Sequence, residues 1–192
     1  MQGTLWIMTE ITVRVLDESE WSLYRDVRLR ALAESPGSFT ATLAEEADRE
    51  EQFWRDRMTR SPRLLAERGS QRQGIVSLGP YEQEPSAGEV FGLYVVPEAR
   101  GTGVSWRLVE AAAALATQQA YLQLYYWVST DNGRAIGFAN NFGFRSTEYR
   151  PSRTSDLEPG EEIAMVLSLE PDATLAPNPT SGKPVTREGP LS

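Results

Sequence analysis

The residues whose types and spacing most clearly suit a chemical function lie in the stretch "VVPEARGTGVSWRL", residues 95–108. Two glycines, Gly101 and Gly103, stand with Arg100 between an apolar run and a segment with helical periodicity. A strand that enters a helix through glycines directs free backbone N–H groups and the positive end of the helix dipole at one point, where a bulky anion can approach. This pattern favours pyrophosphate as the ligand, although two glycines also occur in ordinary tight turns.

Two familiar phosphate-binding loops do not fit this stretch. A P-loop has Lys and then Ser or Thr directly after its last glycine, whereas Gly103 is followed by Val104, Ser105 and Trp106. A dinucleotide-binding turn needs a third glycine where this chain has Trp106. The sequence therefore argues against nucleoside triphosphate hydrolysis and against a dinucleotide-dependent oxidoreductase.

A third kind of anion-binding loop fits better. The string Leu93-x-Val95-x-Pro97-x-x-Arg100-Gly101-x-Gly103-x-Ser105, followed by a helix, resembles the acetyl-CoA-binding motif of the GNAT superfamily of N-acetyltransferases. Ser105 stands where the family has its last small residue. A second block, "WVSTDNGRAIGFANNFGF" at 127–144, is similar to the family's following strand and helix. The resemblance covers the expected domain from Ile11 to Leu169.

The resemblance implies how acetyl-CoA is held. In this family the cosubstrate lies in a wedge between two central strands, with its pantetheine arm along one strand and its pyrophosphate on the glycine loop. Asn132 matches an asparagine that contacts the cosubstrate, and it is also a good helix N-cap. By this resemblance the binding residues are Leu93, Val95, Val96, Arg100, Gly101, Thr102, Gly103, Val104, Ser105 and Asn132.

The resemblance also implies the reaction, which is direct attack of a primary amine on the thioester in a ternary complex, without a metal. The amine belongs to a small molecule or to a protein lysine. The oxyanion donor is expected at the backbone N–H near Val95, and Glu89, at the start of the same strand, is the candidate base. The period of two puts residues 89, 91, 93 and 95 on one face of that strand. The alternative for Glu89 is an ordinary surface carboxylate.

One position departs from the family pattern. The family's usual general acid is a Tyr in the second block, and the corresponding residue here is Ala139. Ser129, Thr130, Tyr125, Tyr126 or a water molecule could take its place. The rival hypothesis is a catalytically degenerate module that binds acetyl-CoA and has a regulatory role.

These residues require strands and helices in a particular order. Alternating or apolar runs predict strands at 11–16, 63–67, 74–78, 89–97 and 122–128, and near 143–150 and 162–169. Helices are expected from Ser19 to about 34 and at 43–58, 103–119 and 132–141, and the acidic residues of 43–58 are expected to form a solvated face. The predicted fold class is α/β (α+β), the GNAT fold, with a central mixed, mostly antiparallel sheet that is splayed at the cosubstrate wedge and flanked by about four helices.

Composition narrows the function further. The chain has 192 residues, a net charge of −8, no Cys and no His, which argues against nucleic-acid binding, thiol or His-based catalysis and the usual zinc sites. No apolar run suits a membrane span and no signal peptide is evident, so a cytoplasmic protein is expected.

The expected domain organisation is an arm at 1–9, the acetyltransferase domain at 10–170 and a disordered tail at 171–192. We expect loops 35–43 and 150–161 to shape the acceptor site, with Phe39 either lining it or anchoring its loop in the core. Dimers are common in the family, so a homodimer is one expectation, and the sequence leaves the oligomeric state open.

Overall fold

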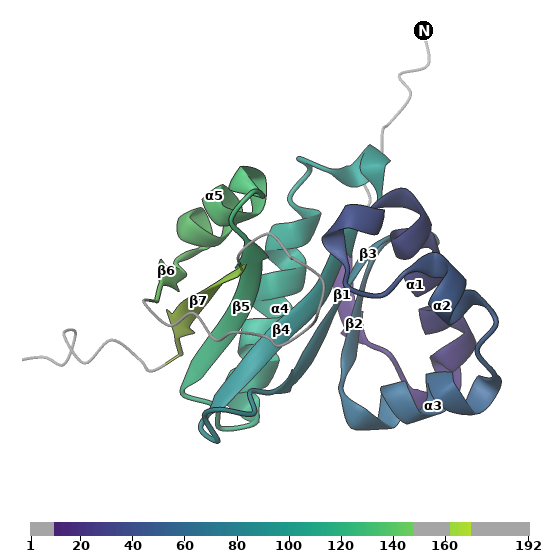
Figure 1. The fold of residues 1–192 in the computed structure, drawn as a ribbon, viewed down its shortest axis with the longest axis horizontal. Helices are drawn as coiled ribbons and strands as arrows, with labels where there is room; N and C mark the ends of the chain where they lie inside the picture. Colours follow the sequence, from purple (N-terminus) through teal and green to yellow (C-terminus); the bar gives the residue numbers. More distant parts are fainter. Residues whose placement is uncertain (1–9, 148–161, 170–192) are drawn as a thin grey trace, which may run out of the picture.

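A single twisted sheet organises the molecule in the computed structural model, which describes residues 10–147 and 162–169 (Figure 1). The expected arm at 1–9, the expected tail at 171–192 and the acceptor loop at 150–161 lie outside the described residues. The strand order is β1-β2-β3-β4-β5-β7-β6, and all neighbours are antiparallel except the parallel pair β4 and β5. The strands are β1 Ile11–Val15, β2 Arg63–Arg68, β3 Gln71–Pro80, β4 Ala87–Val95, β5 Gln123–Ser129, β6 Arg145–Ser146 and β7 Glu162–Ser168.

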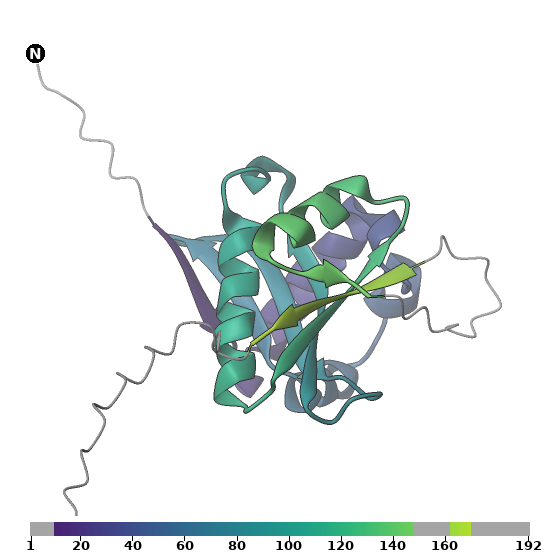
Figure 2. The ribbon, with the colours of Figure 1, turned by 90° about the vertical axis from the view of Figure 1, so that its left-hand side faces the viewer.

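Helices cover both faces of the sheet, with α4 on one face and α1 to α3 on the other (Figures 1 and 2). Because β4 and β5 are parallel, the chain must cross over between them, and α4 is that crossover. The helices are α1 Trp21–Glu34, α2 Leu43–Ala47, α3 Glu51–Arg60, α4 Val104–Gln118 and α5 Gly133–Phe142, with short 3-10 turns η1 Glu18–Glu20, η2 Pro36–Ser38 and η3 Pro97–Ala99. The predicted mixed, mostly antiparallel fold is confirmed.

The helix predicted at 43–58 is wrong in one respect, because it is two helices. Glu50 adopts an extended conformation (φ −69°, ψ 164°) and starts α3 in a new direction. This break lets Arg57 of α3 reach back to Glu46 of α2, with Nη2 and Oε1 3.0 Å apart. Arg28 of α1 binds the same carboxylate, with Nε and Oε2 also 3.0 Å apart.

Glu45, Asp48, Glu50 and Glu51 are exposed, as expected of a solvated acidic face, but Glu46 is an exception, because it is only 2% exposed. Burial alone would raise the pKa of this carboxyl group, but the hydrogen bonds and positive charges of Arg28 and Arg57 outweigh burial and hold the pKa below its usual value. Phe39 lies under the Arg28 guanidinium, 4.6 Å from the ring centroid, and packs against the core. Its position favours the anchoring role.

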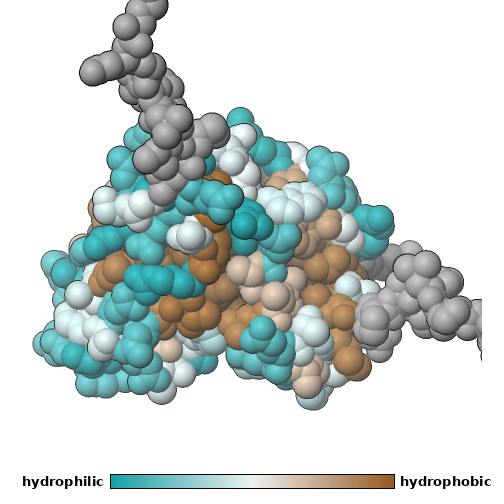
Figure 3. Space-filling view, turned by 180° about the vertical axis from the view of Figure 1, so that it is seen from behind, coloured by the Kyte–Doolittle hydropathy of each residue, from teal (hydrophilic) through white to brown (hydrophobic). Residues whose placement is uncertain are grey.

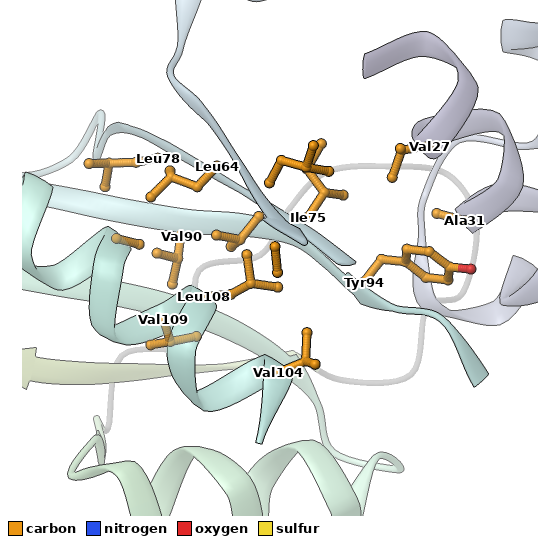
Figure 4. Packing of buried hydrophobic residues seen from close by; sticks show 14 of the residues in the cluster. Val27, Ala31, Leu64, Ile75, Leu78, Val90, Tyr94, Val104, Leu108 and Val109 are labelled. Carbon is orange, nitrogen blue, oxygen red and sulfur yellow. The ribbon is translucent and has the colours of Figure 1, made fainter. Parts of the chain in front are cut away.

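The core is built on both faces of β3 and β4. In Figure 4, Val90 of β4 points toward Val109 and Leu108 of α4, whereas Tyr94, further along the same strand, points toward α1. These residues belong to one continuous cluster of buried side chains. Strand β4 is therefore packed between two helical layers, which hold its backbone from both sides.

Some hydrophobic residues reach the surface. Figure 3 shows them gathered across the middle of the back of the molecule, between hydrophilic borders. The exposed large hydrophobic residues in the described part of the chain are Val15, Leu43, Phe91, Trp106 and Leu122. Among the described residues, no helix is both long and apolar enough to cross a membrane. The expected homodimer stays a prediction.

Candidate functional site

The two central strands separate and leave a wedge between them. Strands β4 and β5 pair in register only from Ala87 with Gln123 to Val90 with Tyr126. Beyond that point β4 continues to Val95 with no further β5 pairing among the described residues, and the strands diverge in Figure 1. Backbone groups along this open edge of β4 are therefore available to an extended ligand.

A β-bulge lies in the open part of β4. Ser77 of β3 is paired with Phe91 of β4, and Ile75 of β3 is paired with Tyr94 of β4. Between these two pairs β3 advances by two residues, whereas β4 advances by three. The extra residue is accommodated at Gly92, whose φ of +64° is readily adopted only by glycine. The bulge reverses the alternation of side chains along the strand.

The bulge makes one sequence prediction wrong, because residues 89 and 95 lie on opposite faces. Glu89 pairs with Gly79, where an added Cβ would come within 3.2 Å of the Phe91 ring, on the face of α1 and α3. Val95 pairs with Gly74, where an added Cβ would meet side chains of α4. Since a strand rises about 3.3 Å per residue, roughly 20 Å of β4 separates the two positions.

The predicted oxyanion donor, the backbone N–H of Val95, faces the open edge. The N–H of the next residue, Val96, donates to the carbonyl oxygen of Gln73 in the neighbouring strand, at 3.0 Å. Successive N–H groups of an extended chain point to opposite sides, so the Val95 N–H points into the wedge.

The glycine loop has the conformation that its sequence requires. Gly101 and Gly103 have φ values of +78° and +90°, and a Cβ added to either would meet no described atom within 4 Å. Gly103 is the N-cap of α4, and no side chain of the described residues caps this helix. The first amides of α4, at Val104, Ser105 and Trp106, are left for an anion in front of the helix.

The side chain of Arg100 does not point at this anion site. Its Nε donates to the carbonyl oxygen of Val95 at 3.1 Å, and its Nη2 donates to Ser35 Oγ at 3.0 Å. The Thr102 hydroxyl donates to the carbonyl oxygen of Ala99 at 2.7 Å. Both side chains hold the loop in shape, and Arg100 ties it to the start of the expected acceptor loop at 35–43.

Asn132 is the N-cap of α5, as one of the two sequence interpretations predicted. Its Oδ1 accepts a hydrogen bond from the Ala135 N–H at 3.0 Å. The capping bond uses the oxygen, so the Nδ2 amide is still able to donate to a ligand. The two interpretations of Asn132 are therefore compatible.

Ala139, which the sequence resemblance places at the position of the family's usual acid, is fully buried, and its methyl group cannot donate a proton. Of the two candidate tyrosines, Tyr125 stacks on Tyr81 with ring centroids 4.1 Å apart. Tyr126 packs edge-on against Phe144, the residue two positions after α5, with centroids 6.0 Å apart. Burial raises the pKa of Tyr126 to about 12, so its hydroxyl stays protonated at neutral pH.

A second group of polar residues was not anticipated from the sequence. The Tyr94 hydroxyl donates to Glu34 at the end of α1, and this bond, with another from Arg30, lowers the pKa of the Glu34 carboxyl group. The Tyr94 pKa is raised by burial and by the same carboxylate. Beside them is a cavity of about 130 Å³ between α1 and the sheet, lined by Asp26, Val27, Arg30, Arg72, Gly74, Tyr94 and Val96.

This cavity is separate from the wedge. It lies on the α1 side of β4, whereas the glycine loop and the Val95 side chain are associated with α4. The bulge brings Tyr94 to this side of β4, and the alternation of residues in the sequence gives no signal for that position. The wedge remains the site that the sequence motifs and the geometry share.

Comparisons with known proteins point to the same family as the sequence motifs. A model of the acetyltransferase (GNAT) family matches residues 28–144. A curated relative, the mycothiol acetyltransferase of Kocuria rhizophila, is 28% identical over 136 residues, which are 67% of this chain. The match takes in 42% of that relative, so the chain spans about two fifths of its length.

Solved structures share the fold. A putative acetyltransferase from Salmonella typhimurium, solved with its cofactor acetyl-CoA, has a TM-score of 0.62 at 18% identity, over 85% of this chain and 96% of its own. A spermidine N-acetyltransferase chimera from Vibrio cholerae and hSSAT has a TM-score of 0.65 at 16% identity, over 83% of this chain and 95% of its own. At these identities the likeness shows the fold alone.

Proposed function

Because the chain belongs to the acetyltransferase (GNAT) family, we propose that it transfers acetyl from acetyl-CoA to a primary amine, on a small molecule or a protein lysine. One observation carries the proposal: the open edge of β4 leads directly into the uncapped, glycine-lined start of α4. An extended amide-containing arm and a pyrophosphate are joined in the same order in acetyl-CoA. The cosubstrate thus matches two adjacent sets of unused backbone groups.

Binding is proposed to rely on backbone atoms. The groups of Leu93, Val95 and Val96 line the pantetheine arm. Of the amides expected from Arg100 to Ser105, those of Gly101, Gly103, Val104 and Ser105 hold the pyrophosphate, because the N–H groups of Arg100 and Thr102 already donate to the carbonyl oxygens of Pro97 and Ala99. The support is that both glycines have positive φ and open space in front of them. Asn132 adds a donor from its Nδ2 amide on the other side of the wedge.

For the chemical step, we place the thioester carbonyl against the Val95 N–H. A neutral amine attacks the carbonyl carbon, and the negative charge that develops on the carbonyl oxygen is stabilised by this hydrogen bond. The C–S bond then breaks, so acetyl passes to nitrogen and CoA leaves as a thiolate, while the nitrogen, which became positively charged on attack, gives its second proton to water and becomes the neutral amide. No bond to the protein is made.

The amine must lose a proton before or during this attack, since an alkyl ammonium with a pKa near 10 is protonated at neutral pH. We propose that Glu89 receives this proton through water, from the α1 face of the wedge. Direct contact is excluded for a thioester at Val95 by the roughly 20 Å of strand between the two positions. A water relay is therefore part of the proposal.

The leaving group needs less help. A thiolate is a weaker base than an amine or alkoxide, so water is sufficient to protonate it. Tyr126 pairs with Val90, five residues before Val95, and lies too deep in the wedge to reach the sulfur. The absence of a tyrosine at Ala139 is thus compatible with an active enzyme.

The test is amine-dependent release of CoA from acetyl-CoA, followed with a thiol reagent over small amines, hydrazines, spermidine and lysine peptides. The chain has no Cys, so the reagent reports only CoA. Acetylated product is confirmed by mass. No release from any amine, with acetyl-CoA still bound in calorimetry, would favour the acetyl-CoA-binding module instead.

A further inference from the structure

Trp106 is an aromatic residue that the proposed reaction does not use. It lies in the first turn of α4, three residues after Gly103, the N-cap in front of which the pyrophosphate is placed. The residue is 42% exposed, although a large apolar ring is costly to leave in water. A large exposed ring next to an anion-binding helix end is suited to stack on a flat apolar group of a ligand.

The ring is held in place from behind. Phe142 of α5 packs against Trp106 with centroids 4.7 Å apart. Phe142 in turn contacts Phe138, at 6.2 Å, and the fully buried Phe144, at 5.8 Å. A surface ring supported by a row of aromatic residues loses little conformational freedom when a ligand stacks on it.

We propose, resting on the proposed function, that the exposed face of Trp106 is the platform on which the adenine ring of acetyl-CoA stacks. The pyrophosphate of acetyl-CoA is joined to adenine through one ribose, so a pyrophosphate on the first amides of α4 keeps the base near this turn. Adenine presents a flat π-face, and stacking of a base on an aromatic side chain contributes about 1–3 kcal/mol to binding.

The charges nearby are consistent with a neutral base. The next residue, Arg107, is paired with Glu110 at 2.9 Å. Trp106 itself has no charge and contacts an apolar ring. The platform thus selects for the nucleoside part of the cosubstrate, while the amides of α4 select for its phosphates.

The test compares two acetyl donors, acetyl-CoA and S-acetyl-4′-phosphopantetheine, which lacks the adenosine part. Their affinities for the wild-type protein and for Trp106→Leu are measured by calorimetry. We expect Trp106→Leu to weaken acetyl-CoA binding about tenfold, corresponding to about 1.4 kcal/mol, and to leave the truncated donor within twofold. Trp106→Phe keeps an aromatic face and recovers most of the loss.

Several outcomes would overturn the platform. Equal affinity of wild type and Trp106→Leu for acetyl-CoA would do so, as would an equal loss for both donors. Conversion of a dimer into a monomer by Trp106→Leu, with unchanged affinity, would assign the ring to an interface between copies. Leu122→Ala, which truncates another exposed apolar side chain beyond the far end of α4, is the matched control and should change neither affinity.

This experiment separates failure of the inference from failure of the proposed function. If the wild-type protein binds neither donor, the acetyl-CoA site itself is wrong. If it binds both donors with similar affinity and Trp106→Leu changes nothing, only the adenine platform is wrong. Thermal unfolding of each variant confirms that the fold is retained.

Discussion

Helix α2 begins with capping side chains and helix α4 begins without them, and the polar groups around the two helices differ in the same way. The start of α2 is closed by Thr42 and Glu45, each of which caps the other's backbone N–H. The start of α4 has a glycine at the cap position and no capping side chain among the described residues. The N-terminus of α2 is capped by its own side chains, whereas the N-terminal amides of α4 are left for a ligand.

Charged groups follow the same division. Around α2 the buried carboxylate of Glu46 is held by Arg28 and Arg57, so this cluster fixes the three helices together. The open edge of β4 and the glycine loop instead offer backbone groups of Val95, Gly101 and Gly103. The comparison teaches that the capped helix start belongs to a structural cluster, and that the helix start without a capping side chain belongs to the proposed site.

The largest expected effect is on the open region. Gly103→Glu places a carboxylate against the pyrophosphate, and such like-charge contacts cost several kcal/mol, so acetyl-CoA affinity should fall about 1,000-fold in calorimetry. Gly103→Ala is the control, because it shares the strain at φ +90° but adds no charge. Equal affinity for wild type and Gly103→Glu would exclude the loop as the phosphate site.

The next effect is on the closed region. Glu46→Gln leaves two partly buried guanidinium groups without their counter-charge, so the free energy of unfolding in denaturant should fall by about 3 kcal/mol. Acetyl-CoA affinity should not change. Glu51→Gln removes an exposed i, i+4 pair with Arg55 and should cost less than about 0.5 kcal/mol. A weaker acetyl-CoA affinity in Glu46→Gln would break the division between the two regions.

The same carboxylate predicts a pH dependence. Its pKa is lowered in the folded protein, so its contribution to stability is present above the ordinary Glu pKa of about 4.3 and is lost as the pH falls through the folded value. Wild type should lose more stability than Glu46→Gln between pH 7 and pH 3. Parallel stability curves for the two proteins would contradict the pKa direction.

A smaller effect is expected for the proposed proton acceptor. Glu89→Gln should lower kcat/KM about 10- to 100-fold at neutral pH, at the low end for acid–base groups because the proton moves through water. The loss should shrink as the pH rises toward the pKa of the amine, while acetyl-CoA affinity is unchanged. A loss that is constant over the whole pH range would show that Glu89 is only structural.

Asn132 tests whether one residue both caps a helix and contacts the ligand. Asn132→Ala should cost about 1 kcal/mol of stability through the lost cap, and Asn132→Ser should recover most of it. Both variants lack the Nδ2 donor, so both should bind acetyl-CoA a few-fold more weakly. If Asn132→Ser binds like wild type, the residue is a cap and nothing more.

The smallest effect is expected at Tyr126. Since it pairs with Val90 deep in the wedge, Tyr126→Phe should change kcat by less than about threefold in the CoA-release assay. A 100-fold loss would identify Tyr126 as the missing general acid, since acid–base groups contribute about 10²- to 10⁴-fold. It would also move the reacting thioester from Val95 toward the start of the wedge.

Much of the fold follows from the sequence because periodicity and glycine motifs are local signals. The strand of Ile11–Val15, the glycine loop and the cap at Asn132 are all found where the sequence predicts them. The break between α2 and α3 was not predicted, because it accompanies ion pairs of Glu46 with Arg28 of α1 and Arg57 of α3. Such long-range pairs leave no local pattern.

The site was predicted less completely, for a related reason. A bulge is a mismatch between two strands, so the alternation of β4 alone places Glu89 and Val95 on one face, while its pairing with β3 places them on opposite faces. Gly92 was the available signal, because a glycine within a strand often marks a bulge. The side-chain bonds of Arg100 likewise depend on Ser35, which is distant in sequence.

Amide hydrogen exchange with and without acetyl-CoA tests the central claim most directly. The account predicts that binding protects the N–H groups of Val95, of Gly101 and of residues 103–106, and leaves α2 and α3 unchanged. Protection confined to the α1 side, around the cavity lined by Arg30 and Tyr94, would contradict it and would move the acetyl-CoA site away from the wedge.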